Sequence, residues 1–188
     1  MQAVTDEQLI RWVATGDASC LATLFERHHK GVYRFCLQMT RNRTQSEDLV
    51  QDVFIRVLRK AAAWRGDGSF KAWLYNIARN VTLDHLRRAN LAGAAFDASL
   101  DAVELADTRS AEQVASGREL VGQVAAAMAR LPAAAREIIW LGRFEFDSYE
   151  ELGLALGCKP GAARVRMHRA MQLLASEIGA PAGDLIHA

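Results

Sequence analysis

The chain has 188 residues, a formal net charge of +1 and 51% hydrophobic residues, so it can bury the core of one domain or of two small ones. No apolar run approaches the roughly 18–20 residues that a membrane span requires. The N-terminal stretch MQAVTDEQLI is acidic where a signal peptide would be basic and then apolar. These features predict a cytoplasmic protein without membrane insertion.

The charge is distributed unevenly along the chain. Residues 1–90 carry 14 Lys and Arg against 9 Asp and Glu, residues 91–117 carry 1 against 5, and residues 118–188 carry 8 against 8. A basic first part and a neutral last part are therefore joined by an acidic middle. This asymmetry favours a polyanionic partner only weakly, because ordinary surfaces often show it too.

The elements predicted along the chain are helices. Capping boxes, in which Ser or Thr precedes Glu or Gln by three residues, predict helix starts at Thr5/Gln8, Thr44/Glu47, Ser110/Gln113 and Ser148/Glu151. Apolar residues at helical spacing predict buried stripes at Leu21, Leu24, Phe25, Val32, Phe35 and Met39, and at Leu49, Val50, Val53, Phe54, Val57 and Leu58. No sustained alternation predicts a strand. The fold class is therefore all-α, and residues 1–90 form a first helical domain.

That first domain ends in the stretch FKAWLYNIARNVTLDHLRRAN, residues 70–90. A helix here buries a stripe made of Phe70, Leu74, Ile77 and Val81. A second line of side chains runs beside the stripe and suits the stacking and hydrogen bonding of an unpaired base: Trp73, Asn76, Asn80, Asp84 and Arg87. The spacing leaves a purely structural role open, with Trp73 completing the core and Asp84 pairing with Arg88.

The next segment, residues 91–117, lacks a sustained apolar stripe and collects acidic residues. It is predicted to be an acidic linker. The helical pattern returns from Leu120 and ends near Ile178, so residues 118–178 form a second small domain. Residues 179–188 are predicted to be a tail.

The second domain contains the pattern of a helix-turn-helix. One helix begins at the Ser148 cap and ends near Gly157, which suits a left-handed turn. A second helix opens at Lys159-Pro160, because proline is tolerated in a first turn. A short helix, a turn containing glycine and a second helix make up the helix-turn-helix layout.

The second helix of this motif separates an apolar side from a basic side. The apolar side comprises Ala163, Met167, Ala170, Leu174 and Ile178. The opposite side comprises Arg164, Arg166, His168, Arg169 and Gln172. Residues 159–169 contain four formal positive charges and no acid, which favours contacts with phosphates and base edges over a merely solvated surface.

Metal binding, cofactor binding and catalysis find no support in the sequence. The chain has three cysteines and no CxxC pair, so neither a disulfide framework nor a four-ligand zinc site is expected. The adjacent His28 and His29 cannot face the same side of a helix. No glycine-rich phosphate loop or nucleophile–base arrangement is present. We therefore expect no cofactor, no metal and no enzyme activity.

Two blocks of the sequence together resemble the bacterial sigma factors, the promoter-specificity subunits of RNA polymerase. SEDLVQDVFIRVL, FKAWLYNIARN and DHLRR resemble their second conserved region, and LPAAAREII, SYEELGLALG and KPGAARVRMHRA resemble their fourth. Nothing between the blocks resembles the large middle region of housekeeping sigma factors, so the layout is similar to the extracytoplasmic-function (ECF) branch. The resemblance implies two helical domains, region 2 and region 4, joined by a linker.

The resemblance also implies roles for residues of the first domain. EDLVQD matches the helix that docks on the clamp helices of the polymerase's largest subunit, through Asp48, Gln51 and Asp52. The same acids would also favour the dipole at a helix start. The RGDGS loop and the helix after it match the part that opens the minus-ten promoter element and captures unpaired bases, through Trp73, Asn76, Asn80, Arg87 and Arg88.

In the second domain, the basic helix matches the reader of the minus-thirty-five element. The implied contacts are Arg164, Arg166, His168 and Arg169. Ala162-Ala163 replaces a frequent Thr-Val in the family, Val165 a frequent small polar residue, and Met171 a frequent Arg. These differences would remove some phosphate contacts and change which bases are read.

The predicted function is therefore a sigma factor that binds core RNA polymerase and promoter DNA and has no catalysis of its own. The resemblance also implies an anti-sigma factor as a partner. The linker would thread the RNA-exit path with its acids mimicking RNA, or would be a solvated spacer. A stand-alone helix-turn-helix transcriptional regulator is the alternative, but it leaves the EDLVQD block and the aromatic–asparagine face unused.

Overall fold

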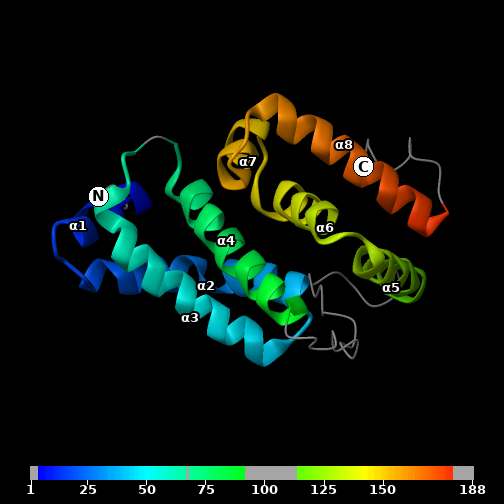
Figure 1. Ribbon diagram of the computed structural model, residues 1–188, viewed down its shortest axis with the longest axis horizontal. Helices are drawn as coiled ribbons and strands as arrows, with labels where there is room; N and C mark the ends of the chain where they lie inside the picture. Colours follow the sequence, from blue (N-terminus) through cyan, green and yellow to red (C-terminus); the bar gives the residue numbers. More distant parts are fainter. Residues whose placement is uncertain (1–3, 67, 92–113, 180–188) are drawn as a thin grey trace.

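The structure is a computed structural model that describes residues 4–66, 68–91 and 114–179 (Figure 1). Helices dominate these residues and no strand occurs among them, which confirms the all-α prediction. The N-terminal region contains α1 (Asp6–Ala14), α2 (Ser19–Thr40), α3 (Arg43–Lys60), the short 3₁₀ turn η1 (Ala61–Ala63) and α4 (Phe70–Leu91). The C-terminal region contains α5 (Val114–Arg130), α6 (Ala133–Trp140), the π-helical turn η2 (Leu141–Glu145), α7 (Tyr149–Leu156) and α8 (Pro160–Ile178).

Local sequence signals explain most of the helix starts. Thr5 caps α1 with the predicted reciprocal capping box to Gln8, and Ser148 caps α7 by accepting a hydrogen bond from the backbone N–H of Glu151. The predicted box at Thr44 is wrong. The N-cap of α3 lies two residues earlier, at Asn42, which has the extended backbone of a cap and whose side-chain oxygen accepts from the N–H of Gln45 at 3.0 Å.

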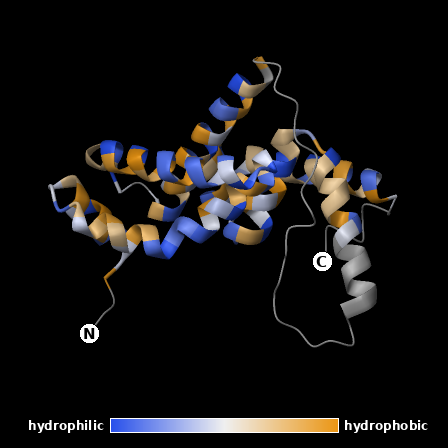
Figure 2. Ribbon diagram, turned by 90° about the horizontal axis from the view of Figure 1, so that it is seen from below, coloured by the Kyte–Doolittle hydropathy of each residue, from blue (hydrophilic) through white to orange (hydrophobic). Residues whose placement is uncertain are grey.

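The N-terminal region has a core of apolar side chains from α1 to α4. Most residues of the two predicted stripes are buried, whereas Leu21 and Phe25 are only partly buried. Leu58 is a correction, because 44% of its surface is exposed on the outer side of α3. Figure 2 shows both hydrophobic and hydrophilic residues along the coloured helices, as expected for amphipathic helices of a small bundle.

The C-terminal region starts earlier than predicted. α5 begins at Val114, so residues 114–117, assigned to the linker, are helical. The first residue of that segment, Leu91, is the last residue of α4. Residues 92–113, which include the Ser110/Gln113 box, lie outside the described residues. α8 ends at Ile178 as predicted, and residues 180–188 of the tail are likewise outside the described residues.

The two regions pack directly against each other. α4 lies against α7, and α2 lies against α6, so the C-terminal helices cover one side of the N-terminal bundle (Figure 1). Arg136 of α6 is buried at this contact and its guanidinium donates to the carbonyl oxygen of Gln38 at 3.4 Å. Burial, together with the nearby Arg41, lowers the pKa of Arg136.

Candidate nucleic-acid and polymerase interfaces

Helix α4 is held in place by its predicted apolar stripe. Phe70, Leu74, Ile77 and Val81 are all buried, with Phe70 and Leu74 fully inaccessible. The start of the helix is fixed from another element, since the backbone N–H of Phe70 donates to the Glu7 carboxylate at 3.1 Å. The stripe therefore sets which side of α4 faces away from the bundle.

The amides of the predicted base-binding face form a chain of hydrogen bonds. Asn80 is exposed and its amide nitrogen donates to the side-chain oxygen of Asn76 at 3.2 Å. Asn76 is half-buried and donates to the carbonyl oxygen of Ala155 in α7 at 3.1 Å. The structure thus brings the two asparagines together, one turn apart, but directs one of them to the C-terminal region.

The other predicted members of this face differ in their surroundings. Trp73 is half-buried, with its ring centroid 6.0 Å from that of Phe70, so it contributes to the edge of the core. Arg87 and Arg88 are exposed near the end of α4. The ion-pair alternative needs a correction, because Asp84 pairs with Arg87 at 3.5 Å rather than with Arg88. A pair this exposed contributes little to stability.

Two cations of α4 were missed by the sequence reasoning. Lys71 and Arg79 lie eight residues apart, about two helical turns, on either side of Asn76. The Lys71 ammonium lies 3.1 Å from the Glu145 carboxylate, and Arg79 Nε lies 2.7 Å from Glu137 Oε1. The spacing of basic residues around Asn76 could have indicated them, but their carboxylate partners lie far away in the sequence.

Helix α8 presents the predicted basic face. Ala163, Met167, Ala170 and Leu174 are buried against the rest of the C-terminal region, and Ile178 is half-buried. All four predicted contacts with duplex DNA are exposed: Arg164, Arg166, His168 and Arg169. Gly157 has a φ of 65°, in the left-handed region, and Pro160 occupies the first turn of α8, as the turn chemistry predicts.

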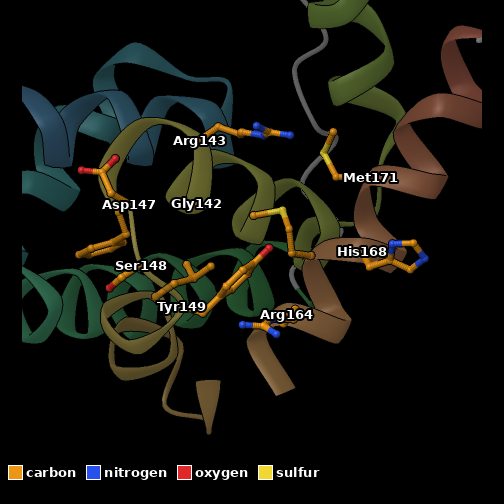
Figure 3. A pocket seen from close by; sticks show the side chains of 11 residues that line it. Gly142, Arg143, Asp147, Ser148, Tyr149, Arg164, His168 and Met171 are labelled. Atoms are coloured by element: carbon orange, nitrogen blue, oxygen red, sulfur yellow. The ribbon is translucent and has the colours of Figure 1, made fainter. Parts of the chain in front are cut away.

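A pocket lies beside the start of this basic face (Figure 3). Arg164 and His168 line it from α8, and Tyr149 and Phe146 line it from α7 and the segment before it. The Arg164 guanidinium carbon lies 5.2 Å from the centre of the Tyr149 ring, within the range of a cation–π contact. Tyr149 therefore orients a side chain that was predicted to contact DNA.

The predicted polymerase-binding residues lie on the outer side of α3. Asp48, Gln51 and Asp52 are all exposed. They are continued along the helix by Ile55 and Leu58, which are 46% and 44% exposed. A polar edge beside exposed large apolar side chains is typical of a protein-binding surface. The apolar half of this surface was not predicted, because helical spacing assigned Leu58 to the core.

No metal centre or membrane span is found in the part of the chain that the structure describes. Its residues include no group of three or more His, Cys, Asp or Glu arranged to hold a metal ion. None of the helices within the described ranges is long and apolar enough to cross a bilayer. His28 instead pairs with Asp6, and His29 bonds the backbone oxygen of Phe25.

A small helical bundle followed by a helix-turn-helix with an exposed basic second helix is the architecture of a DNA-binding transcription factor. Residues 24–91 match the family described as Sigma-70 region 2, and residues 122–174 match Sigma-70, region 4.

Relatives of the chain match most of its length. RNA polymerase sigma factor CarQ of Myxococcus xanthus is 33% identical over 164 residues, which cover 87% of this chain and 92% of CarQ. ECF RNA polymerase sigma factor SigE of Mycolicibacterium smegmatis is 35% identical over 165 residues, which cover 86% of this chain and 63% of SigE. The chain therefore belongs to the RNA polymerase sigma factors, and within them to the ECF type.

Solved structures share the fold. CnrH in complex with the cytosolic domain of CnrY is similar with a TM-score of 0.66 and 22% identity, covering 91% of this chain and 95% of CnrH. RpoE of Bartonella quintana, solved with the anti-sigma factor NepR, has a TM-score of 0.63 and 22% identity, covering 84% of this chain and 96% of RpoE.

Membership of the family determines the general function. The chain is a transcription-initiation factor that binds core RNA polymerase and directs it to promoters. The stand-alone helix-turn-helix regulator is not supported, because region 2 is matched as well as region 4.

Proposed function

We propose that this sigma factor uses three separate surfaces during promoter recognition. α8 reads the minus-thirty-five element as duplex through Arg164, Arg166, His168 and Arg169. α4 binds the unpaired minus-ten strand through Trp73, Asn76, Asn80, Arg87 and Arg88. α3 docks on the clamp helices of the largest polymerase subunit through Asp48, Gln51 and Asp52.

The observation that carries the proposal is the basic face of α8. All four cationic or titratable side chains assigned to it are exposed, while the opposite side of the helix is buried. Residues 159–169 contain four formal positive charges and no acid. A helix with such a face suits insertion into the major groove, where arginine reads guanine and phosphates fix the register.

The assignment of α4 rests on side chains that suit unpaired bases. Asn76 and Asn80 offer amide donors and acceptors one turn apart, and half-buried Trp73 lies beside them. Stacking on an aromatic ring is worth about 1–3 kcal/mol per base and tolerates many sequences. Exposed Arg87 and Arg88 would contact the phosphates that follow.

The domain limits and wider biology follow from these roles. Residues 1–90 act as region 2, residues 91–117 mainly as the linker, and residues 118–178 as region 4. The protein has no catalytic activity of its own and works in the cytoplasm, where core polymerase and DNA are found. An anti-sigma factor regulates it, as NepR is the anti-sigma factor in the RpoE complex.

Reconstituted transcription tests the proposal. The chain is mixed with core RNA polymerase and genomic promoter fragments, and the run-off transcripts are sequenced. Transcripts that start downstream of a shared pair of elements, and only when the chain is present, are expected. Transcripts in its absence, or tight binding to the same DNA without polymerase, would contradict the proposed function.

A further inference from the structure

Helix α1 has no part in the three surfaces of the proposed function, yet it contacts both sides of the loop before α4. It packs on η1, after which that loop begins, and on α4, where the loop ends. It also lies before residues 24–91, the range that matches Sigma-70 region 2. Neither the family match nor the assigned surfaces therefore give α1 a role.

The first half of the loop is held by Arg11 of α1. The Arg11 guanidinium carbon lies 5.7 Å from the centre of the Trp64 ring, within the range of a cation–π contact. Gly66 has a φ of 79°, and a Cβ built there would lie 3.4 Å from Arg11 Nη2. Arg11 therefore lies over the ring that begins the loop and against backbone in a conformation that favours glycine.

The end of the loop is held by Glu7, one turn before Arg11 on α1. Its carboxylate accepts a hydrogen bond from the backbone N–H of Phe70 at 3.1 Å. This N–H needs a partner from outside, because the first N–H groups of an α-helix have no intrahelical carbonyl to bond. The dipole of α4 also favours a carboxylate at this end. Glu7 thus caps α4 from another helix, beside Ser69, whose hydroxyl accepts from the N–H of Ala72 at 3.2 Å.

Helix α1 is itself firmly placed, so it can act as an anchor. Its apolar side is buried in the bundle, with Ile10 fully inaccessible. At its first turn, the Asp6 carboxylate lies 2.6 Å from Arg27 Nη1 and 2.5 Å from His28 Nε2, both on α2. The His28 ring in turn lies 5.5 Å from the ring of Phe70. Helix α2 therefore fixes the end of α1 that carries Glu7.

We propose that α1 positions the loop before α4 for strand opening, with Glu7 and Arg11 as its positioning residues. They hold the two sides of the loop in the shape that captures unpaired minus-ten bases, without contacting DNA themselves. This inference rests on the proposed role of α4 and its loop.

The advantage of such contacts is that the loop is ordered before DNA arrives. Fixing the backbone of a free loop costs conformational entropy, and a loop that orders only on binding loses that amount from the free energy of capture. This loop has more freedom to lose than most, because Gly66 and Gly68 both have left-handed φ values. Anchoring by α1 removes part of this cost from the capture step.

The inference predicts a defect in one step of initiation only. Core binding is assigned to the exposed side of α3 and duplex binding to α8, and neither surface includes Glu7 or Arg11. Loss of either contact should therefore slow strand opening and leave the affinities for core polymerase and for duplex DNA unchanged. A general loss of structure would lower both affinities together with the opening rate.

Substitutions that remove one contact at a time test the inference in the reconstituted holoenzyme. Glu7→Met removes the acceptor for Phe70, whereas Glu7→Gln keeps an oxygen that accepts, and Arg11→Met removes the cation over Trp64. Glu26→Met is the matched control, because it removes a carboxylate from an exposed position of α2. Permanganate reactivity at saturating holoenzyme measures the opening rate on a promoter fragment identified by run-off sequencing. Fluorescence anisotropy measures the affinities for core polymerase and for the duplex fragment.

Glu7→Met is expected to open the promoter about tenfold more slowly than Glu26→Met, as loss of a hydrogen bond to a charged group implies. Arg11→Met is expected to open it about threefold more slowly, the scale of an exposed cation–π contact. Glu7→Gln is expected to open it at a rate closer to wild type than to Glu7→Met. The inference is overturned if Glu7→Met or Arg11→Met opens the promoter as fast as the control, if Glu7→Gln is as slow as Glu7→Met, or if both affinities fall with the opening rate.

Folding and the proposed function are distinguished from the inference in the same experiment. Circular dichroism shows whether each variant is helical, and if Glu7→Met fails to fold, the exposed Arg11 decides the outcome through Arg11→Met. If the wild-type holoenzyme opens no promoter, the proposed function fails and the inference fails with it. If wild type and the two variants open promoters equally fast, only the inference fails and the sigma-factor role stands.

Discussion

Helices α4 and α8 are both proposed to contact DNA, yet they present different surfaces in this conformation. The basic side chains of α8 are exposed, whereas Asn76, Lys71 and Arg79 of α4 are engaged by the C-terminal region. A duplex reader depends on charge, which water solvates well. A reader of unpaired bases also needs amides and aromatic rings, and an internal partner can occupy these groups when DNA is absent.

The difference extends to what holds each helix. α4 is anchored by large side chains, with Phe70, Leu74 and Tyr75 almost inaccessible. α8 is anchored partly by alanines, with Ala163 and Ala170 buried at its contacts. Small residues let α8 approach its neighbours closely, so fewer apolar atoms hold α8 than hold α4.

The largest effect is expected from a substitution that removes a buried anchoring side chain of α4. Phe70→Ala removes a fully buried ring and is expected to lower the free energy of unfolding by about 3–5 kcal/mol. Urea denaturation followed by circular dichroism measures it. Leu91→Ala on the same helix is the control, because Leu91 is 89% exposed and its truncation should change stability by less than about 0.5 kcal/mol. Equal effects of the two substitutions would contradict the anchoring role.

The second-largest effect is expected for α8, whose basic side chains are exposed. Arg169→Ala in α8 is expected to weaken binding of the holoenzyme to duplex minus-thirty-five DNA by about 1–3 kcal/mol and to flatten its salt dependence. Filter binding over a range of salt concentrations measures both. Arg130→Ala serves as the comparison, since Arg130 pairs with Glu177 within the C-terminal region at 2.6 Å. An unchanged promoter preference would contradict the assignment of Arg169 to the proposed interface.

A smaller effect is expected from Asn80, the exposed asparagine of α4. Asn80→Ala should slow strand opening about tenfold while leaving duplex binding by α8 unchanged, because it removes one amide from the proposed base-binding face. Permanganate reactivity of the promoter reports opening. Binding to core polymerase should remain as in the wild type. If core binding is lost instead, Asn80 has a structural role.

The smallest effect is a dependence on pH. Because burial raises the pKa of Glu137 in the folded protein, its proton-linked stabilisation is fully present below the ordinary value of 4.5 and is lost as the pH rises through the raised value. Wild type is therefore expected to gain stability relative to Glu137→Gln, which does not titrate, as the pH falls from 7 toward 4.5. Urea denaturation at several pH values measures the difference. A constant difference would mean that burial does not perturb this carboxyl.

Local features of the fold were predictable because they depend on short stretches of chain. The stripe through Phe70 and Val81, the cap at Ser148 and the left-handed Gly157 all follow from spacing or from backbone chemistry. The cap of α3 was not predictable in this way. Asn42 takes that place after Arg41 adopts a left-handed φ of 57°, a conformation that a pattern search for Ser or Thr does not consider.

The sequence predicted a set of candidate site residues, but it did not predict how they are placed on the surface. Exposure of the four basic positions on α8 follows from the period of its helix, and it is confirmed. Leu58 was misassigned, because helical spacing alone does not show which side of α3 other helices cover. The partners of Asn76, Lys71 and Arg79 were unpredictable, since each lies more than 55 residues away along the chain.

The sequence by itself determined the helices, the helix-turn-helix and the family, because periodicity, capping and motif order are properties of neighbouring residues. Only the tertiary structure decided that the C-terminal region lies across α4 and that Glu137 and Glu145 meet its cations. The physical reason is that these contacts depend on how two separately patterned surfaces fit together. The residue pattern of one surface does not show where the other surface will lie.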